Sequence, residues 1–165
     1  CITADIRDRL YFDGIDYIIH LAAQISVPRS IQNPDETLSV NVEGTKSIIS
    51  TAEKAGVKKI IFASSAAIYG DCQDIPINEK APMIPQSPYA LSKIIGEELL
   101  QKSEIETCSL RFFNIYGPGQ SSEGGYAAVI PAFKKAISFG EECTIFGDGY
   151  QVRDFIHVHD LVRIN

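Results

Sequence analysis

Asp16-Tyr-Ile-Ile-His-Leu-Ala-Ala23 is the stretch of sequence that decides the fold. A continuous apolar run of this length is typical of a parallel strand that is covered on both faces. Residues 59–64 (Lys-Ile-Ile-Phe-Ala-Ser) and residues 106–113 are runs of the same kind. We therefore expect three buried, parallel strands.

Helical periodicity fills both intervals between these strands. Apolar residues recur every three or four positions from Leu38 to Ala52, and Gly56 follows as a helix cap. In the second interval, Pro88 precedes a similar stripe over residues 89–102. Alternating strands and helices predict right-handed crossovers and an α/β fold, a doubly wound parallel sheet with helices on both faces.

The second half of the chain has a different texture. A glycine-rich loop over residues 117–125 is followed by a predicted helix (131–139), a short predicted strand (143–146) and a turn (147–149). Ligands of open parallel sheets bind beyond the carboxyl ends of the strands. We therefore expect the site in the segments that follow the strands: 23–24, 64–65 and 114–116.

Charge and composition exclude several classes of function. The 165 residues carry 15 Lys and Arg against 21 Asp and Glu, a net charge of −6, and the mean hydropathy is +0.01. This balance excludes a disordered chain or a fibre. An acidic excess without a basic run argues against a nucleic-acid partner. The longest apolar runs are strand-sized, which is too short for a membrane span.

The cysteines and the chain ends suggest a cellular setting and a fragment. Cys1, Cys72, Cys108 and Cys143 lie far apart without a Cys-x-x-Cys pair, which favours reduced thiols in a cytoplasmic protein and no zinc site. The sequence begins without Met and ends in the middle of a pattern, Leu-Val-Arg-Ile-Asn. We therefore expect a piece of a longer protein.

Tyr89-Ala-Leu-Ser-Lys93 carries the clearest chemistry. Four residues apart on a helix, the phenol and the ammonium share one face, where the cation can lower the pKa of the phenol and make it a base. Ser65, at the end of the preceding predicted strand, could share a substrate hydroxyl with Tyr89. Tyr89 and Lys93 could instead be a solvated pair on the helix surface. Ser64 and Ser65 could instead cap the end of the strand.

Seven motifs follow one another along the chain: Asp5-Ile-Arg-Asp8, His20-Leu-Ala-Ala23, Asn41-Val-Glu-Gly-Thr45, Ser64-Ser65, Tyr89 to Lys93, Arg111-Phe-Phe-Asn-Ile-Tyr-Gly117, and Gly147-Asp-Gly-Tyr-Gln-Val-Arg-Asp-Phe-Ile-His-Val-His-Asp160. Together they resemble the extended short-chain dehydrogenase/reductases, and among these the NAD-dependent nucleotide-sugar epimerases of the UDP-glucose 4-epimerase type. The resemblance covers nearly the whole chain, but only the middle of a full-length member. It implies a Rossmann-like sheet, incomplete here, with part of a small substrate-binding domain.

The resemblance also implies a domain division. Residues 1–120 would be the dinucleotide-binding domain, truncated at its N-terminus, and residues 121–165 part of the substrate-binding region, with 150–160 returning to the cofactor domain. The Gly-rich GxxGxxG turn that seats the NAD pyrophosphate in the family is absent from the sequence. We therefore expect the 165 residues alone to bind NAD poorly and to be inactive, and a non-catalytic NAD-binding fragment stays an alternative.

NAD-binding residues follow from the matching positions. Asp5 and Ile6 would flank the adenine, and Lys93 would bind the nicotinamide ribose, next to Tyr89. The remaining contacts, which would line the cofactor or lie by the nicotinamide, are Leu21, Ala22, Ala23, Gln24, Asn41 and Phe113. Asp5 could instead be a turn carboxylate, and Asn41 a core amide satisfied by neighbouring backbone.

Substrate-binding residues follow in the same way for a UDP-sugar. Ser65 and Tyr89 would contact the reacting hydroxyl, and the other positions would bind the diphosphate or the nucleotide base: Asn114, Val129, Thr144, Ile145, Phe146 and Arg153. Arginine is the bidentate phosphate donor of proteins. Arg153 could instead form a surface ion pair with Asp154.

Two further pairs of residues, the neighbouring phenylalanines and two histidines, can be interpreted without any function. Phe112 and Phe113, read without context, belong to the core. His157 and His159 alternate along a predicted strand, so we expect them on opposite faces, where they would not share a metal ion.

The implied reaction inverts carbon 4 of a UDP-glucose or UDP-galactose type sugar. Tyr89 would take the proton of the 4-hydroxyl while NAD accepts a hydride, and the 4-keto intermediate would rotate before the hydride returns. The related 4,6-dehydratases carry an Asp-Glu pair directly after the catalytic hydroxyl, where this sequence has Ala66 and Ala67. An epimerase is therefore favoured, with a dehydratase, a decarboxylase or a reductase of the same family as alternatives.

The sugar and the assembly are less closely specified. The segment from Ser26 to Ser30 resembles members that act on UDP-hexoses, including N-acetylated and glucuronic forms. Members of the family commonly form homodimers through two helices. The apolar stripes of the two predicted helices could serve this purpose, although core packing explains them equally well.

Overall fold

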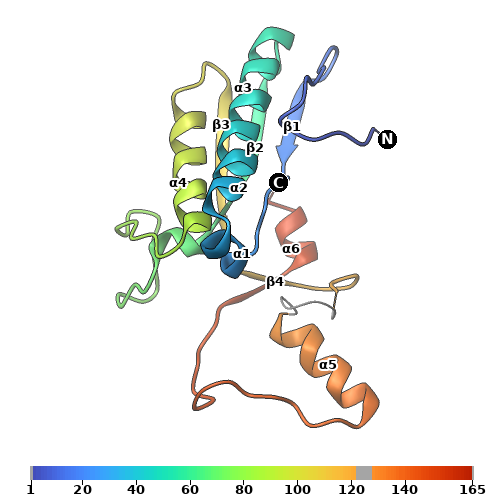
Figure 1. Cartoon of the computed structure of the whole chain (residues 1–165), viewed down its shortest axis with the longest axis vertical. Coiled ribbons are helices and arrows are strands. Elements are labelled where there is room, and N and C mark those ends of the chain that lie inside the picture. The colour runs from blue at the N-terminus through green and yellow to red at the C-terminus, as the bar shows by residue number, and fades with distance from the viewer. Residues whose placement is uncertain (1, 122–127, 165) are drawn as a thin grey trace. The chain divides into compact units, whose positions relative to one another are not determined.

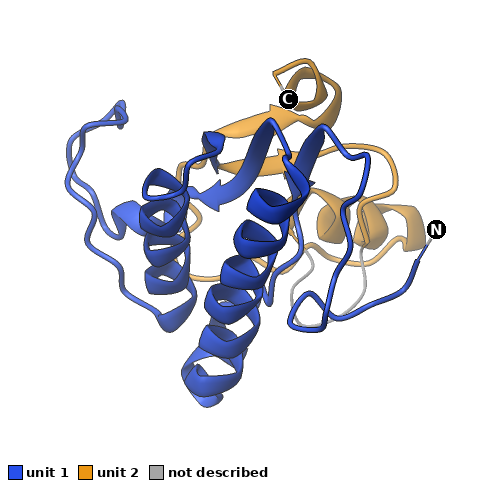
Figure 2. Ribbon diagram, turned by 90° about the horizontal axis from the view of Figure 1, so that it is seen from above, with its two compact units in different colours: residues 1–112 blue, residues 113–165 orange. Residues whose placement is uncertain are grey.

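The computed structural model describes residues 2–121 and 128–164, with its elements labelled in Figure 1. The chain divides into two compact units, 1–112 and 113–165, coloured separately in Figure 2. Cys1 and residues 122–125 of the predicted glycine-rich loop lie outside the described residues. The domain division at residue 120 and the return of residues 150–160 stay predictions.

The first unit contains a parallel sheet of three strands in the order β1-β2-β3. The strands are β1 (Tyr17–His20), β2 (Lys59–Ser65) and β3 (Glu106–Phe112). All three coincide with the apolar runs of the sequence. The Rossmann-like α/β class is therefore confirmed.

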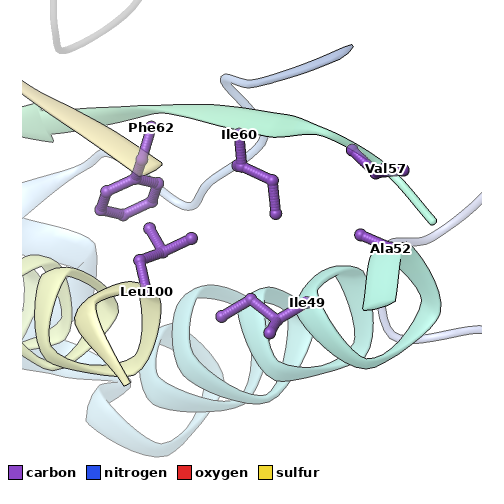
Figure 3. Close-up of a cluster of buried hydrophobic side chains, with 6 residues drawn as sticks. All are labelled: Ile49, Ala52, Val57, Ile60, Phe62 and Leu100. Atoms are coloured by element: carbon purple, nitrogen blue, oxygen red, sulfur yellow. The ribbon is translucent and has the colours of Figure 1, made fainter. Parts of the chain in front are cut away.

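Helices α3 (Gly44–Ala55) and α4 (Pro88–Gln101) connect these strands and pack on one face of the sheet. Ile60 and Phe62 are two residues apart on β2, so both side chains point to the same face. They form the core with Ile49, Ala52, Val57 and Leu100, as Figure 3 shows.

Cover on both faces of the sheet, as expected from the sequence, is not found within residues 2–112. Two right-handed crossovers that step in one direction along β1-β2-β3 return on the same side. On the opposite face, Tyr17 and Ile19 of β1 are exposed. The two helices instead lie side by side over one face (Figure 1).

Gly96 of α4 brings this helix close to β2. A Cβ atom added at this glycine would lie 2.7 Å from Cζ of Phe62. Only a residue without a side chain permits this approach at the present spacing.

The predicted helix over residues 38–52 is divided into shorter elements. It contains the end of α2 (Pro34–Leu38), a π-helical turn η1 (Ser39–Glu43) and most of α3. Gly56 ends α3 with φ of 73°, in the left-handed region, which confirms the predicted cap. A short helix, α1 (Val27–Gln32), is capped by the Ser26 hydroxyl, and a 3-10 turn, η2 (Ala66–Tyr69), follows β2.

The second unit contains a two-stranded parallel sheet, β4 (Asn114–Tyr116) with β5 (Phe155–His157), and the helices α5 (Val129–Phe139) and α6 (Val158–Val162). The predicted strand 143–146 is wrong, because this segment has no regular structure and no strand pairs with it. A strand needs a hydrogen-bonded neighbour, which an apolar alternation alone does not supply.

The prediction that His157 and His159 lie on opposite faces is also wrong. The strand ends at His157, and His159 belongs to α6, so the two rings come together with centroids 4.8 Å apart. Among residues 2–121 and 128–164, no group of three or more metal-ligating side chains occurs. In the same ranges no helix combines the length and the apolar character that crossing a membrane requires.

Candidate active site

Lys93 is the most strongly constrained of the predicted catalytic residues. It lies in the second turn of α4, whose start is set by Pro88 and by the Ser87 hydroxyl, which accepts a hydrogen bond from the N–H of Ala90 at 3.1 Å. Only 3% of Lys93 is exposed. Its Nζ donates to the carbonyl of Ala63 at 2.8 Å, and burial lowers the pKa of the ammonium to about 8.

Tyr89 lies one turn before Lys93, on the same face of α4. The ammonium is 5.8 Å from the centroid of the Tyr89 ring and 4.9 Å from that of Phe62. A cation so close stabilises negative charge on the phenol oxygen more than neutral phenol. The predicted pairing of Tyr89 with Lys93 is therefore a partly buried arrangement and not a solvated one.

Ser65 ends β2 and begins η2. Its hydroxyl oxygen accepts a hydrogen bond from the N–H of Ala67 at 3.2 Å, so this serine does cap the turn. The interaction uses the oxygen as acceptor and leaves the hydroxyl proton able to point elsewhere. Helix α4 packs against both β2 and η2, the elements that flank Ser65. The approach of Ser65 to the Tyr89 oxygen stays a prediction.

Asn41 holds the turn that follows β1. Its Oδ1 accepts from the N–H of Gln24 at 2.7 Å, and its Nδ2 donates to the Gln24 carbonyl at 3.0 Å and to Ser92 Oγ at 2.9 Å. Ser92 in turn donates to the Tyr89 carbonyl at 2.7 Å. Asn41 is thus a buried amide satisfied largely by backbone, the alternative considered above, and it ties this turn to the start of α4.

The turn itself is only partly covered. Leu21 is 61% exposed and Ala22 is exposed, whereas Ala23 and Gln24 are half-buried. The turn stands at the carboxyl end of β1, where open parallel sheets bind their ligands. Its contact with NAD stays a prediction.

Asp5 and Ile6 precede the sheet. The Asp5 carboxylate accepts from the backbone N–H of Arg7 at 2.9 Å and pairs with its guanidinium at 2.6 Å. These hydrogen bonds lower the pKa of Asp5 to about 2. Asp5 thus has the turn role that the sequence left open, while Ile6 packs against Gly44 of α3. Their place beside an adenine stays a prediction.

His20, the last residue of β1, was quoted as part of a motif but received no role of its own from the sequence. Its Nε2 is 2.9 Å from Thr45 Oγ1, and this hydroxyl donates to the Asn41 carbonyl at 2.6 Å. The Thr45 oxygen must therefore accept from His20, which places the imidazole proton on Nε2. Burial first, and the charge of Lys93 second, lower the pKa of His20 to about 4.

A buried ion pair was also missed. Glu97 is 3% exposed, and both its oxygens accept hydrogen bonds from the Arg111 guanidinium, the shortest at 2.7 Å. The Ser64 hydroxyl donates to the same carboxylate. One signal was present: Glu97 follows Lys93 by four residues, which places a second charge on the buried face of α4.

The second unit brings six predicted substrate residues to one cavity. Its volume is about 560 Å³, within the range of small-molecule sites. Much of its wall is apolar, with Phe133 and Phe155 among the side chains that line it. The six predicted residues on this wall are Asn114, Val129, Thr144, Ile145, Phe146 and Arg153.

The two cavity residues predicted to bind the diphosphate, Asn114 and Arg153, donate their side-chain hydrogen bonds to backbone carbonyls among the described residues. Asn114 Nδ2 donates to the Asp154 carbonyl at 2.8 Å, and Arg153 Nη1 donates to the carbonyl of Val152 at 2.8 Å. No ion pair joins Arg153 to Asp154 in the described part of the chain, so that alternative is not what the structure shows. Phe113 is half-buried at the start of the unit.

The sequence of the chain is similar to those of known proteins. A sequence profile described as the NAD dependent epimerase/dehydratase family matches residues 2–165. The chain is 40% identical to a putative UDP-glucose 4-epimerase of Methanocaldococcus jannaschii, over 99% of this chain and 57% of that protein.

Solved structures show the same similarity. The UDP-N-acetylglucosamine 4-epimerase of Methanobrevibacter ruminantium M1, in complex with UDP-N-acetylmuramic acid, superposes with a TM-score of 0.90 at 36% identity, covering 98% of this chain and 53% of that one. For the UDP-glucose 4-epimerase of Thermotoga maritima with UDP-glucose, the TM-score is 0.85 at 38% identity, with 91% and 50% covered. The chain thus spans about half the length of these relatives. It belongs to the NAD-dependent epimerase/dehydratase family.

Proposed function

We propose that the full-length protein epimerises a UDP-sugar at carbon 4, with NAD as cofactor and a 4-keto sugar as intermediate. The observation that carries this proposal is the buried ammonium of Lys93 beside the ring of Tyr89, at the end of the strand that carries Ser65. The names of the relatives support the class of substrate, because they are epimerases of UDP-glucose and UDP-N-acetylglucosamine.

The residues of the first unit fit NAD. The Ala63 carbonyl accepts one of the three N–H donors of the Lys93 ammonium, which leaves donors suited to ribose hydroxyls. The turn from Leu21 to Gln24 is held at the carboxyl end of β1 by Asn41. NAD, when bound, supplies a reversible hydride acceptor.

Tyr89 is the proposed base for the sugar 4-hydroxyl. With a pKa of about 8, Lys93 is mostly charged at pH 7 and favours the phenolate form of the tyrosine. The Ser65 hydroxyl, whose oxygen already accepts from Ala67, is free to direct its proton to the same sugar oxygen. Proton removal and return at this one oxygen are what both halves of an epimerisation need.

The cavity of the second unit is the proposed site of the UDP group. Apolar side chains there suit a flat base, whereas Arg153 and Asn114 suit phosphate oxygens. An elimination of water would need an additional acid and base next to Ser65. The residues at those two positions are Ala66 and Ala67, whose methyl groups can neither donate nor accept a proton. Epimerisation is therefore proposed over dehydration.

The test is the conversion of UDP-glucose and UDP-N-acetylglucosamine by the full-length protein, followed by NMR for inversion at carbon 4. Tyr89→Phe removes only the phenol oxygen and should lower turnover at least about a thousandfold while calorimetric binding of UDP-glucose persists. Tyr17→Phe, on an exposed position of β1, is the matched control. Turnover by Tyr89→Phe at the wild-type rate would remove the assigned base.

Three further features belong to the proposal. We expect a homodimer and a cytoplasmic location, for which gel filtration with light scattering and cell fractionation are the tests. We also expect the 165-residue chain alone to bind NAD poorly and to be inactive. A nanomolar to low-micromolar affinity of this chain for NAD by calorimetry would contradict that expectation.

A further inference from the structure

Glu97 and Arg111 join five segments of the first unit through side-chain hydrogen bonds. Glu97 on α4 accepts from Ser64 at the end of β2 and from Arg111 on β3. The same guanidinium donates to the hydroxyl of Tyr69 in η2 at 2.8 Å and to the carbonyl of Glu79, in the loop before α4, at 2.8 Å. The end of β2, the neighbouring strand β3, the helix α4, the turn η2 and the loop before α4 are thus connected at one point.

This point lies directly beside the proposed catalytic groups in the covalent chain. Ser64 precedes Ser65, and Ser64 is paired in register with Arg111 across the sheet. On α4, Glu97 follows Lys93 by one turn and Tyr89 by two, on the same face. Lys93 makes a second tie to the same strand through the Ala63 carbonyl. Two neighbouring hydrogen bonds, from Ser64 to Glu97 and from Lys93 to the Ala63 carbonyl, therefore fix the position of α4 along β2.

The pair is more than a source of stability. Buried ion pairs are often replaceable by apolar side chains without loss of stability, whereas their hydrogen bonds define one geometry. An arginine side chain is charged at every working pH, and the hydrogen bonds to Glu97 raise the pKa of Arg111 further above its ordinary value. Because Glu97 receives hydrogen bonds from β2 and β3 together, α4 cannot slide along the strand without breaking them.

We propose that Glu97 and Arg111 are positioning residues, which act through Ser64 to hold the Tyr89–Lys93 turn of α4 in line with Ser65. This inference rests on the proposed function. A small displacement of a base from its substrate hydroxyl lowers turnover strongly. It hardly changes the binding of a nucleotide whose proposed site is the cavity of the second unit. Loss of the tie should therefore appear in kcat and not in KM.

The experiment uses three variants of the full-length protein, assayed for inversion at carbon 4 well below their melting temperatures. Ser64→Ala removes only the hydroxyl link and should lower kcat about tenfold, with KM changed less than about twofold. Glu97→Ala should lower kcat about a hundredfold, and Glu97→Gln, which keeps an acceptor for Ser64, should recover about tenfold of that loss.

Two substitutions on or after the same helix are the controls. Glu98→Ala alters the exposed neighbour of Glu97, and Ser103→Ala removes a hydroxyl that, among the described residues, donates to the carbonyl of Leu100. Both should leave kcat unchanged. Ser64→Ala should melt within a few degrees of Ser103→Ala.

The outcomes separate the two proposals. Wild-type kcat in Ser64→Ala and Glu97→Ala, in a protein that does invert carbon 4, overturns the positioning role and leaves the proposed function standing. A loss of kcat that follows the loss of melting temperature, with no recovery in Glu97→Gln, also overturns it. A wild-type protein that inverts no UDP-hexose overturns both.

Discussion

The two units differ in how their predicted site residues are held. In the first unit, the predicted site residues Lys93 and Asn41 are each only 3% exposed and each is fixed by hydrogen bonds to another element, and the same holds for Glu97, which was not predicted. In the second, Ile145 is 61% exposed, Phe146 is 83% exposed, and Arg153 donates only to its own neighbour's carbonyl in the described structure.

This difference matches the two tasks proposed for them. Proton transfer requires atoms placed to fractions of an ångström, which buried polar networks provide. Retention of a nucleotide requires apolar area and a few charge-assisted hydrogen bonds, which exposed side chains can form when the ligand arrives. Substitutions of the buried site residues of the first unit should therefore change turnover or stability, and substitutions of the cavity residues of the second unit should change only affinity.

The strongest test of this contrast is Lys93→Met in the full-length protein. Removal of the ammonium takes away the charge that favours the Tyr89 phenolate, so kcat should fall about a thousandfold. Methionine fills the buried space left by the lysine stem, and UDP-glucose affinity should stay within about threefold. Turnover by stopped assay and affinity by calorimetry are the measurements. An affinity that fell as far as turnover would break the contrast.

Acid should weaken the first unit through His20. The pKa of His20 is about 4 in the fold, below the ordinary 6.5, so the folded state keeps the imidazole neutral. Between these values the unfolded chain binds a proton that the folded chain does not. The free energy of unfolding is therefore not reduced by His20 above pH 6.5. Below that pH, protonation of His20 in the unfolded chain lowers it progressively, by about 3 kcal/mol at pH 4.

Urea unfolding at pH 7.5 and pH 4.5 measures this loss. His20→Gln keeps a donor for Thr45 but does not titrate, so most of the difference between the two pH values should disappear. His159→Gln, at an exposed position of α6, is the control. An unchanged pH dependence in His20→Gln would assign the acid sensitivity to other groups.

Asn41→Ala tests the network that holds the turn after β1. It leaves the N–H and carbonyl of Gln24 and the hydroxyl of Ser92 without their buried partner, which should cost about 2 kcal/mol of unfolding free energy. Asn33→Ala, at a helix start where the side chain makes no capping hydrogen bond, should cost less than about 0.5 kcal/mol. Equal losses in urea titrations of the two variants would argue against the network.

The smallest expected effect lies in the second unit. Arg153→Ala should weaken UDP binding about tenfold, which is about 1.4 kcal/mol, because it removes a phosphate donor. The melting temperature should not change, since Arg153 is exposed and holds no other element. Calorimetry with UDP and thermal unfolding separate the two effects. Arg163→Ala, exposed at the end of α6, is the control.

The sequence predicted well what depends on local pattern. The three strands, the helix that begins at Pro88 and the cap at Gly56 follow from apolar periodicity and from the conformational freedom of glycine. These signals act within one element. The spacing of Tyr89 and Lys93 identified their common face for the same reason.

What depends on partners distant in sequence was predicted poorly. Residues 143–146 have a strand-like pattern but no strand beside them, and His159 follows a strand that ends two residues earlier. The role of Glu97 depends on Arg111, 14 residues away, and on Ser64, 33 residues away. No local pattern encodes such contacts, because tertiary packing creates them.

The contact of Gly96 with the Phe62 ring makes these two positions share one volume. A methyl group at position 96 would act as a wedge between helix and strand, and it would lengthen the reach that Lys93 needs to meet the Ala63 carbonyl. A larger residue at 96 should therefore be tolerated only together with a smaller one at 62. In related sequences, we therefore expect the residues at positions 96 and 62 to vary in opposite directions in size. Neither residue takes part in the chemistry, but together they set the distance between the Lys93 ammonium and the Ala63 carbonyl.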